Sequence, residues 1–230
     1  MSRLVVITGG TKGIGAAISR RFADAGDKVV ALGRADLDVT DEVAVGHVLG
    51  SLGEIDVLVN NAGIATSAPV HRTTVEDWQA QLEVNATGAF LCTRAVLPGM
   101  RERDRGRIVT VASTAAHVGQ LYTAGYTASK HAAVGLMRTV AAEVAGSGVT
   151  ANAVCPTFVR TDMTTRTIRR VAEATGQSEE DSETSIARLS PLGRLLEPDE
   201  VAFAVAFLAA PEAGAINGQT IVLDGGGIQA

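Results

Sequence analysis

The sequence predicts an α/β fold: a single Rossmann-like, doubly wound parallel sheet with helices on both faces. Apolar, β-branched runs such as "LVVIT" at 4–8 alternate with segments of helical periodicity. A continuous apolar run of this kind is typical of a strand that is buried on both sides, as in parallel sheets. The 230 residues are 46% hydrophobic and 20% charged, which fits one globular domain over 1–230.

Strands and helices alternate from the first residues. The strand at 4–8 leads through a glycine-rich turn into 16–26, where apolar residues recur at helical spacing and Gly26 is a typical helix stop. "KVVAL" at 28–32 is the second strand, and "IDVLVNNAG" at 55–63 is a third that runs into a turn.

The rest of the chain continues this alternation, which implies parallel strands joined by right-handed crossovers. In such sheets a ligand binds beyond the carboxyl ends of the strands, where the strand order reverses. The remaining strands are expected at 106–113, 148–156 and 219–227, and the remaining helices at 41–53, 75–103, 123–146 and 198–210.

One segment interrupts the pattern. After "ALGR" at 31–34 comes "ADLDVTD" at 35–41, with no room for a helix between them. Because a parallel crossover needs a dozen or more residues, "DLDV" cannot pair parallel to the preceding strand through an ordinary helix. The sequence therefore predicts that the third, edge strand of the sheet is reduced or absent.

Composition and charge argue against several classes of function. The net charge of −5 gives no reason to expect nucleic acid or an anionic membrane as a partner, and no apolar run reaches the roughly 20 residues that span a bilayer. Two distant cysteines without a secretory leader favour a cytoplasmic location. No metal site is expected, because the cysteines (Cys92 and Cys155) and the histidines (His47, His71, His117 and His131) are scattered.

The turn "TGGTKGIG" at 8–15 leaves a buried strand and opens a helix. Gly9, Gly13 and Gly15 permit tight backbone geometry and the close approach of a phosphate, and the helix N-terminus offers free N–H groups to a pyrophosphate. This context favours a dinucleotide site over a turn made only for packing.

The second strand ends at Gly33–Arg34, where an acidic residue would accept hydrogen bonds from the ribose hydroxyls of NAD. No Asp or Glu stands there. Arg34 suits a 2′-phosphate, and Lys12 in the glycine loop adds a second cation. We therefore expect NADP(H) to be favoured over NAD(H), with a solvated surface charge as the alternative reading of Arg34.

"YTASK" at 126–130 places Tyr126 and Lys130 four residues apart, on one face of a helix. A phenol beside an ammonium loses its proton more easily. An isolated pair of this kind is most often an unimportant exposed pair, so the other motifs must decide.

Taken together, the motifs resemble those of the short-chain dehydrogenase/reductase family, over essentially the whole chain. "TGGTKGIG" is similar to the family's cofactor loop, "NNAG" at 60–63 to its sheet-steadying turn, and "YTASK" to its Tyr-x-x-x-Lys. Ser113 precedes Tyr126 by the family's usual spacing. The stretches 110–143 and 190–202 are most similar to the 3-oxoacyl-thioester reductase and ketoreductase branch.

The resemblance implies a catalytic set of Asn85, Ser113, Tyr126 and Lys130. Tyr126 would be the general acid in carbonyl reduction, with its pKa lowered by Lys130 and the nicotinamide. Lys130 would also hold the nicotinamide ribose. Ser113 would donate to the substrate carbonyl oxygen, and Asn85 would hold a water that links Lys130 to solvent.

The resemblance also implies the cofactor contacts, with two departures. Thr157 follows Pro156 where the family has glycine, which restricts the backbone, and the short approach to Asp38 puts its adenine contact in doubt. The implied cofactor residues are Gly9, Thr11, Lys12, Gly13, Ile14, Gly15, Arg34, Asp38, Asn61, Ala62, Gly63, Tyr126, Lys130, Pro156, Val159 and Thr161.

Residues 157–197, here called the lid segment, occupy the place of the family's lid and substrate wall. Gly176 and the following "SEEDSE" indicate a mobile surface turn. Arg166, Arg169 and Arg170 share one helical face and would suit an anionic substrate handle, such as the phosphates of coenzyme A or an acyl-carrier arm, although a solvated face is the commoner outcome. His117 is a weaker candidate for substrate contact.

The sequence thus predicts an NADP(H)-dependent oxidoreductase that acts on a small-molecule carbonyl or alcohol, with a CoA- or acyl-carrier-linked 3-oxoacyl thioester or a polyketide-like ketone as the expected substrate. An NAD-dependent dehydrogenase of a sugar, steroid or cyclic alcohol is the alternative, and a non-catalytic nucleotide sensor a remote one. A homotetramer built through 75–103, 123–146 and the C-terminal strand is the assembly that the resemblance implies.

Overall fold

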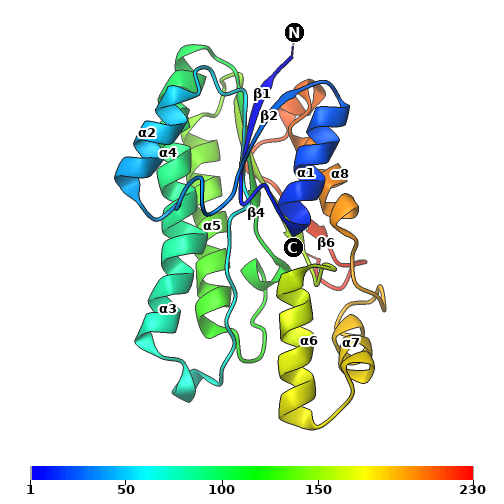
Figure 1. Cartoon of the computed structure of the whole chain (residues 1–230). Coiled ribbons are helices and arrows are strands. Elements are labelled where there is room, and N and C mark those ends of the chain that lie inside the picture. Colours follow the sequence, from blue (N-terminus) through cyan, green and yellow to red (C-terminus); the bar gives the residue numbers. More distant parts are fainter. Residues whose placement is uncertain (1, 230) are drawn as a thin grey trace.

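A computed structural model describes residues 2–229. In this range six parallel strands form one sheet in the order β2-β1-β3-β4-β5-β6 (Figure 1). The order reverses between β1 and β3, so the carboxyl ends of these two strands flank the expected ligand position. The strands are β1 (Leu4–Thr8), β2 (Lys28–Leu32), β3 (Val57–Asn60), β4 (Gly106–Val111), β5 (Val149–Pro156) and β6 (Thr220–Leu223).

Helices cover both faces of the sheet, as expected. α1 and α8 lie on one face, whereas α2, α4 and α5 lie on the other (Figure 1). The α-helices are α1 (Gly13–Asp24), α2 (Glu42–Ser51), α3 (Val75–Leu82), α4 (Gly88–Glu102), α5 (Ala124–Glu143), α6 (Asp162–Thr175), α7 (Glu179–Ala187) and α8 (Pro198–Leu208), with short 3₁₀ turns at Val70–Arg72, Thr114–Ala116 and Pro211–Ala215.

The core is divided by the sheet into two apolar clusters. Side chains of β1 alternate between them: Val6 joins the cluster under α2, α4 and α5, and Val5 and Ile7 join the cluster under α1 and α8. A third, small cluster of Ile168, Ile186 and Leu195 lies within the lid segment.

The edge strand is absent, as the sequence predicts. Residues 35–40 form turns and coil, and α2 begins at Glu42. Leu37 and Val39 nevertheless bury their side chains in the core. A Cβ on Gly88 would lie 2.6 Å from Val39 Cγ2, so this glycine permits the shortened segment to pack directly against α4.

The long helix expected at 75–103 is present but not regular. A π-helical segment, Glu83–Thr87, joins α3 to α4 and contains Asn85. In the lid segment the expected mobile turn is wrong in part: Gly176 ends α6 with a left-handed backbone (φ 74°), and the acidic run forms the start of α7, capped by Ser178. Acidic residues in a first turn stabilise a helix through its dipole, which explains their place there.

Candidate active site

The glycine loop and the "NNAG" turn are clamped to each other at the carboxyl ends of β1 and β3. The Asn61 side-chain amide donates to the carbonyls of Thr8 (3.0 Å) and Gly9 (3.1 Å), and Thr8 Oγ1 accepts the backbone N–H groups of Asn61 and Ala62, both at 3.1 Å. Gly9 has φ 63°, and a Cβ there would lie 3.0 Å from Ala62 Cα. The "NNAG" turn therefore holds the start of the glycine loop in place through these hydrogen bonds.

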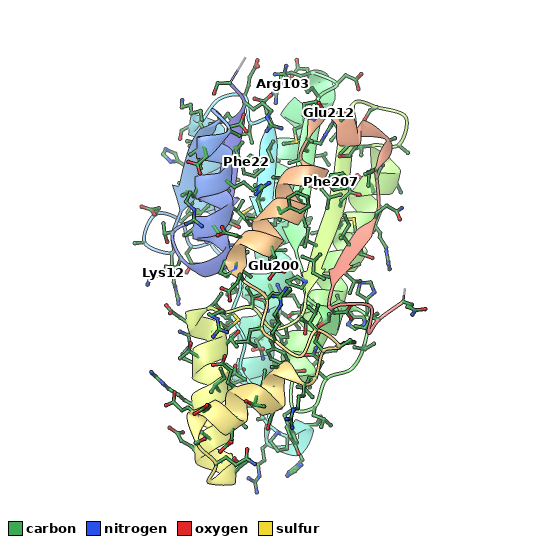
Figure 2. All side chains as sticks on the ribbon, turned by 90° about the vertical axis from the view of Figure 1, so that its right-hand side faces the viewer. Lys12, Phe22, Arg103, Glu200, Phe207 and Glu212 are labelled. Carbon is green, nitrogen blue, oxygen red and sulfur yellow. The ribbon has the colours of Figure 1, made fainter. Side chains whose placement is uncertain are left out.

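The amino end of α1 is open to an anion. Lys12 occupies the N-cap without a side-chain hydrogen bond, and the first turn carries no acidic residue. Figure 2 shows Lys12 at the end of α1 that faces α6 of the lid segment. The free N–H groups and the positive end of the helix dipole suit a pyrophosphate.

The loop also faces the start of the lid segment. A Cβ on Gly13 (φ 50°) would lie 3.2 Å from Thr161 Cγ2, so only glycine leaves room between them. The residues present therefore fit a dinucleotide, because the backbone of the loop stays accessible to a phosphate while Thr11 and Lys12 are exposed beside it. Ile14 is half-buried against the core cluster under α1.

The end of β2 differs from the expectation that no acidic group stands there. Asp36 folds back across the turn, and its Oδ2 accepts the N–H of Gly33 at 2.8 Å. A Cβ on Gly33 would lie 2.8 Å from Thr11 Oγ1 and 3.3 Å from Asp36 Oδ2, which puts the carboxylate beside the loop. The role of Asp36 is not predictable from the sequence, because Asp36 lies beyond the strand end and only the reversal of the turn brings its carboxylate to Gly33.

Arg34 and Asp38 lie near this turn. The Arg34 side chain is 90% exposed, and its guanidinium lies 3.9 Å from Asp38 Oδ2. Asp38 Oδ1 accepts from the backbone N–H (3.0 Å) and the hydroxyl (2.7 Å) of Thr40, and these hydrogen bonds lower the pKa of Asp38 below its usual range. Arg34 is therefore free to contact a ligand, whereas Asp38 is held in place by its own turn.

Tyr126 and Lys130 lie one turn apart on α5, and the Lys130 ammonium is 5.6 Å from the centre of the Tyr126 ring. Lys130 is 6% exposed and donates to the carbonyl of Val111 at 3.0 Å. Burial lowers the pKa of Lys130 to about 8. A lysine that loses hydration favours its neutral form.

The expectation that Lys130 lowers the pKa of Tyr126 is wrong for the chain by itself. Burial raises the pKa of Tyr126, and the nearby Ser113 hydroxyl opposes only part of this rise. Ser113 follows β4, is 8% exposed, and accepts the N–H of Ala115 at 3.2 Å. Cys155 lies close to the same groups, and burial raises the pKa of its thiol to about 11.

Asn85 lies beside Lys130 but is bonded mainly to the loop after β3. Its Oδ1 accepts the N–H of Ile64 (2.8 Å), and its Nδ2 donates to the Ile64 carbonyl and the Ser129 hydroxyl, both at 2.9 Å. A Cβ on Gly63 would lie 3.2 Å from Asn85 Oδ1 and 3.6 Å from Lys130 Nζ. The Asn85 and Lys130 side chains therefore both lie beside Gly63.

One further clamp on this loop was missed by sequence reasoning. Gln81 is 1% exposed, accepts the N–H of Thr66 at 3.1 Å and donates to the Asp77 carbonyl at 3.1 Å. Asn85 and Gln81, one helical turn apart, therefore hold two nearby residues of the loop, Ile64 and Thr66. A glutamine within a helical pattern gave no signal of this, because its partner is a backbone group.

The start of the lid segment follows β5 without strain. The Thr157 N–H donates to the Leu223 carbonyl at 3.0 Å and so prolongs the pairing of Pro156 with β6. Val159 is buried, and its carbonyl accepts from the hydroxyls of Thr164 (2.6 Å) and Thr161 (3.3 Å).

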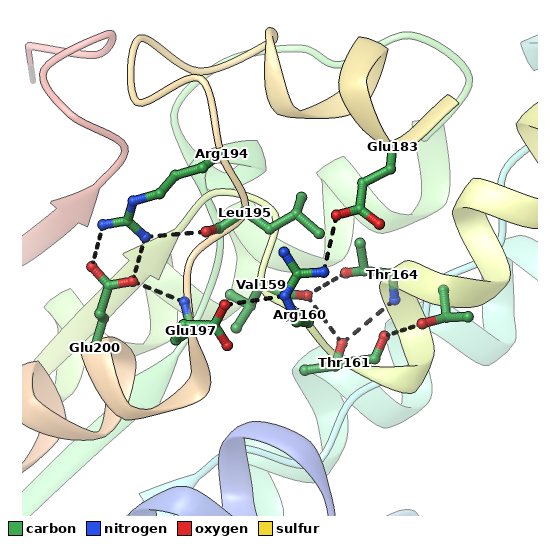
Figure 3. Close-up of polar contacts among 10 residues, drawn as sticks. Val159, Arg160, Thr161, Thr164, Glu183, Arg194, Leu195, Glu197 and Glu200 are labelled. Atoms are coloured by element: carbon green, nitrogen blue, oxygen red, sulfur yellow. Dashed lines mark hydrogen bonds and ion pairs between the residues drawn. The ribbon is translucent and has the colours of Figure 1, made fainter. Parts of the chain in front are cut away.

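Ion pairs fasten the base of the lid segment (Figure 3). Arg160 lies between Glu183 of α7 (2.9 Å) and Glu197 (3.1 Å), and Arg194 forms a two-nitrogen pair with Glu200. These side chains are between 38% and 55% exposed, so each pair contributes little alone. Together they orient α6 and α7 on the body.

The remaining candidates make contacts outside the group of Ser113, Tyr126 and Lys130. The predicted common face of three arginines is divided: Arg169 pairs with Glu179 at 3.5 Å, whereas Arg170 donates to Ser67. His117 is half-buried with its pKa lowered mainly by burial, and its Nε2 has no partner within residues 2–229. In the same range, no three His, Cys, Asp or Glu side chains are grouped for a metal, and no helix is long and apolar enough to cross a membrane.

Comparison with known proteins decides the family. A family model described as enoyl-(acyl carrier protein) reductase matches residues 34–227. The chain is 40% identical to an acetoacetyl-CoA reductase of Shinella zoogloeoides over 247 aligned positions, which cover 98% of each protein. The chain belongs to the short-chain dehydrogenase/reductase family. It is an oxidoreductase of that family, with the fold that the sequence predicts.

Other members of the short-chain dehydrogenase/reductase family agree. A 3-oxoacyl-(acyl-carrier-protein) reductase of Vibrio cholerae is 35% identical, covering 97% of this chain and 96% of the relative. The solved structure of an actinorhodin polyketide ketoreductase variant with NADPH has a TM-score of 0.90 at 32% identity, covering 98% of this chain and 97% of that one.

Proposed function

We propose that this enzyme reduces the ketone of a 3-oxoacyl thioester, or a polyketide-like ketone, with NADPH. The main observation in support is that Ser113, Tyr126 and Lys130 lie close together, and that a glycine loop suited to a phosphate is present. The names of the relatives support the substrate class, since they include acetoacetyl-CoA, 3-oxoacyl and polyketide reductases.

Bound NADPH supplies the hydride. Tyr126 donates its phenolic proton to the substrate carbonyl oxygen, and Ser113 donates a hydrogen bond to the same oxygen as negative charge develops there. Lys130 holds the nicotinamide ribose and presents positive charge to the phenolate that is left. The raised pKa of Tyr126 keeps the phenol protonated before the reaction, as a general acid requires.

The nucleotide is held by the groups around the glycine loop and the start of the lid segment. Gly13 and the amino end of α1 face the pyrophosphate, with Thr161 opposite. Arg34 and Lys12 bind the 2′-phosphate of NADPH, which is the basis of the proposed preference. Asn61 and Ala62 border the adenine ribose, and Gly63, beside Lys130, lies towards the nicotinamide ribose with Pro156 and Val159.

Asp36 supports one alternative: an NAD-dependent dehydrogenase of a sugar, steroid or cyclic alcohol. Its carboxylate beside Gly33 is an acceptor for ribose hydroxyls and repels a 2′-phosphate. The remote alternative, a nucleotide sensor without catalysis, has no supporting feature, because the four catalytic side chains are all retained.

Initial rates of NADPH and NADH oxidation with acetoacetyl-CoA test the proposal. We expect turnover with NADPH to exceed that with NADH. Tyr126→Phe should lose about 10²-fold or more in kcat and still bind NADPH, because only the proton donor is removed. Turnover close to the unmodified level in this variant would refute the mechanism, and a preference for NADH would favour the alternative.

Assembly and location remain part of the proposal. We infer a homotetramer, as expected from the family, and a cytoplasmic location, as expected from the two distant cysteines; the exposed Phe90 on α4 and Phe207 on α8 are candidates for burial between subunits. Light scattering after size exclusion tests the assembly, and a stable monomer would refute it.

A further inference from the structure

Two arginines of α6 lie on the side of the lid segment that faces the body. Arg170 Nη1 donates to the carbonyl (3.0 Å) and the hydroxyl (3.1 Å) of Ser67, in the loop after β3. Arg166 stands one helical turn before Arg170 and shares its side of the helix. Arg169 points elsewhere, to Glu179 of α7.

The Ser67 contact lies in the same loop as Gly63, which is beside Lys130. A Cβ on Gly63 would lie 3.6 Å from Lys130 Nζ. Four residues of extended chain span at most about 14 Å, so Ser67 lies within that distance of Gly63. The extended pantetheine arm of a 3-oxoacyl thioester is longer than this distance, so it can reach from the reacting ketone to a phosphate bound beside Ser67.

The charge of Arg170 is not neutralised. Ser67 offers only neutral oxygens, and both are engaged by Nη1 alone. Among residues 2–229, no carboxylate is within ion-pair distance of Arg166 or Arg170, although Glu173 lies on the next turn of α6 and is exposed. A guanidinium with free nitrogens suits a phosphate, which it can bind through two parallel hydrogen bonds.

We propose that Arg170, assisted by Arg166, binds the phosphate of a phosphopantetheine handle on the substrate and exchanges its Ser67 contacts for that phosphate. The inference rests on the proposed thioester function and deepens it. Coenzyme A and an acyl-carrier protein both present this chemistry. In a chain of net charge −5, these two residues provide local attraction for an anion beside the loop after β3.

Matched substrates test the inference. For Arg170→Ala, we expect KM for acetoacetyl-CoA to rise about tenfold with kcat nearly unchanged, because a charge-assisted contact far from the reacting carbon is lost. KM for acetoacetyl-pantetheine, which lacks phosphate, should change less than about twofold. Arg169→Ala is the matched control and should behave like the unmodified enzyme with both substrates, and Arg170→Lys should be intermediate for acetoacetyl-CoA.

An equal rise in KM for both substrates, or no rise for either, would overturn the inference. An acetoacetyl-carrier protein distinguishes the two sources. A similar effect of Arg170→Ala on carrier and CoA substrates assigns the phosphate next to pantetheine, whereas an effect on the CoA substrate alone assigns the additional phosphates of CoA.

A binding measurement separates this inference from the proposed function. In calorimetry with NADP⁺ present, the unmodified enzyme should bind CoA more tightly than pantetheine, and Arg170→Ala should abolish the difference. If no thioester is reduced yet this difference is found, the proposed function fails and the handle site stands. If thioesters are reduced but CoA and pantetheine bind equally, the handle site fails alone.

Discussion

The Lys130 ammonium lies 5.6 Å from the centre of the Tyr126 ring, and both groups have lost most of their hydration. Burial acts on them in opposite directions, since it disfavours whichever form is charged. The pKa of Lys130 falls to about 8 and that of Tyr126 rises. At neutral pH the charged Lys130 is therefore held in the fold at a cost in stability, whereas Tyr126 stays neutral.

Lys130→Met should stabilise the protein at pH 7 while removing activity. A fall in pKa from 10.5 to about 8 corresponds to about 3 kcal/mol of penalty for the buried charge, and the lost bond to the Val111 carbonyl offsets about 1 kcal/mol. We expect a net gain of roughly 1 to 3 kcal/mol in the free energy of unfolding, measured by urea denaturation. A loss of stability at pH 7 would contradict the burial argument.

The same group predicts a pH dependence. Between pH 8 and 10.5 the unfolded chain binds more protons at Lys130 than the folded chain, so the free energy of unfolding should rise with pH across this window. Tyr126, with its raised pKa, acts oppositely above pH 10. The rise from pH 8 to 10 should be absent in Lys130→Met, and an equal slope in both proteins would assign it to other groups.

Asp36→Asn should shift cofactor preference towards NADPH. The variant removes a negative charge beside the position of the 2′-phosphate and keeps an acceptor for the Gly33 N–H. We expect the ratio of kcat/KM for NADPH to that for NADH to rise several-fold, and Arg34→Ala to lower it by a similar factor. If this kcat/KM ratio is unchanged in both variants, the turn after β2 does not determine cofactor preference.

Gly125→Ala should destabilise the protein although alanine favours helices. A Cβ at position 125 would lie 2.6 Å from Gln81 Nε2, and Gln81 cannot move without breaking its hydrogen bond with the Thr66 N–H. We expect a loss of about 1 to 2 kcal/mol in thermal or urea unfolding. Gly135→Ala, on the same helix with no atom within 4 Å of the new Cβ, is the control and should gain up to about 1 kcal/mol.

Both cysteines should be unreactive in the folded protein. Burial raises the pKa of Cys92 to about 12 and that of Cys155 to about 11, and neither thiol is accessible. At pH 8 we expect no labelling by a disulfide reagent without denaturant and two thiols labelled in urea, because only the thiolate reacts. Rapid labelling of Cys155 in the native enzyme would show that the catalytic group opens to solvent.

Local sequence signals were sufficient for the layers and for an edge strand that is reduced or absent, and the family resemblance was sufficient for the gathering of Ser113, Tyr126 and Lys130. They were insufficient for side chains whose contacts depend on a reversal of the chain or on a hydrogen bond to a backbone group. Asp36 reaches Gly33 only because the turn folds back, and Gln81 matters only because its partner is the Thr66 N–H. Likewise, the division of Arg169 from Arg170 depends on where α7 lies, which helical spacing does not encode.

The small apolar cluster of Ile168, Ile186 and Leu195 is separate from the two clusters that flank the sheet. Its few contacts give α6 and α7 a lower free energy of local opening than the β1 region, whose side chains are fully buried. We therefore expect the helix that carries Arg170 to open locally more easily than the strands of the sheet. Substrate entry then requires no rearrangement of the sheet.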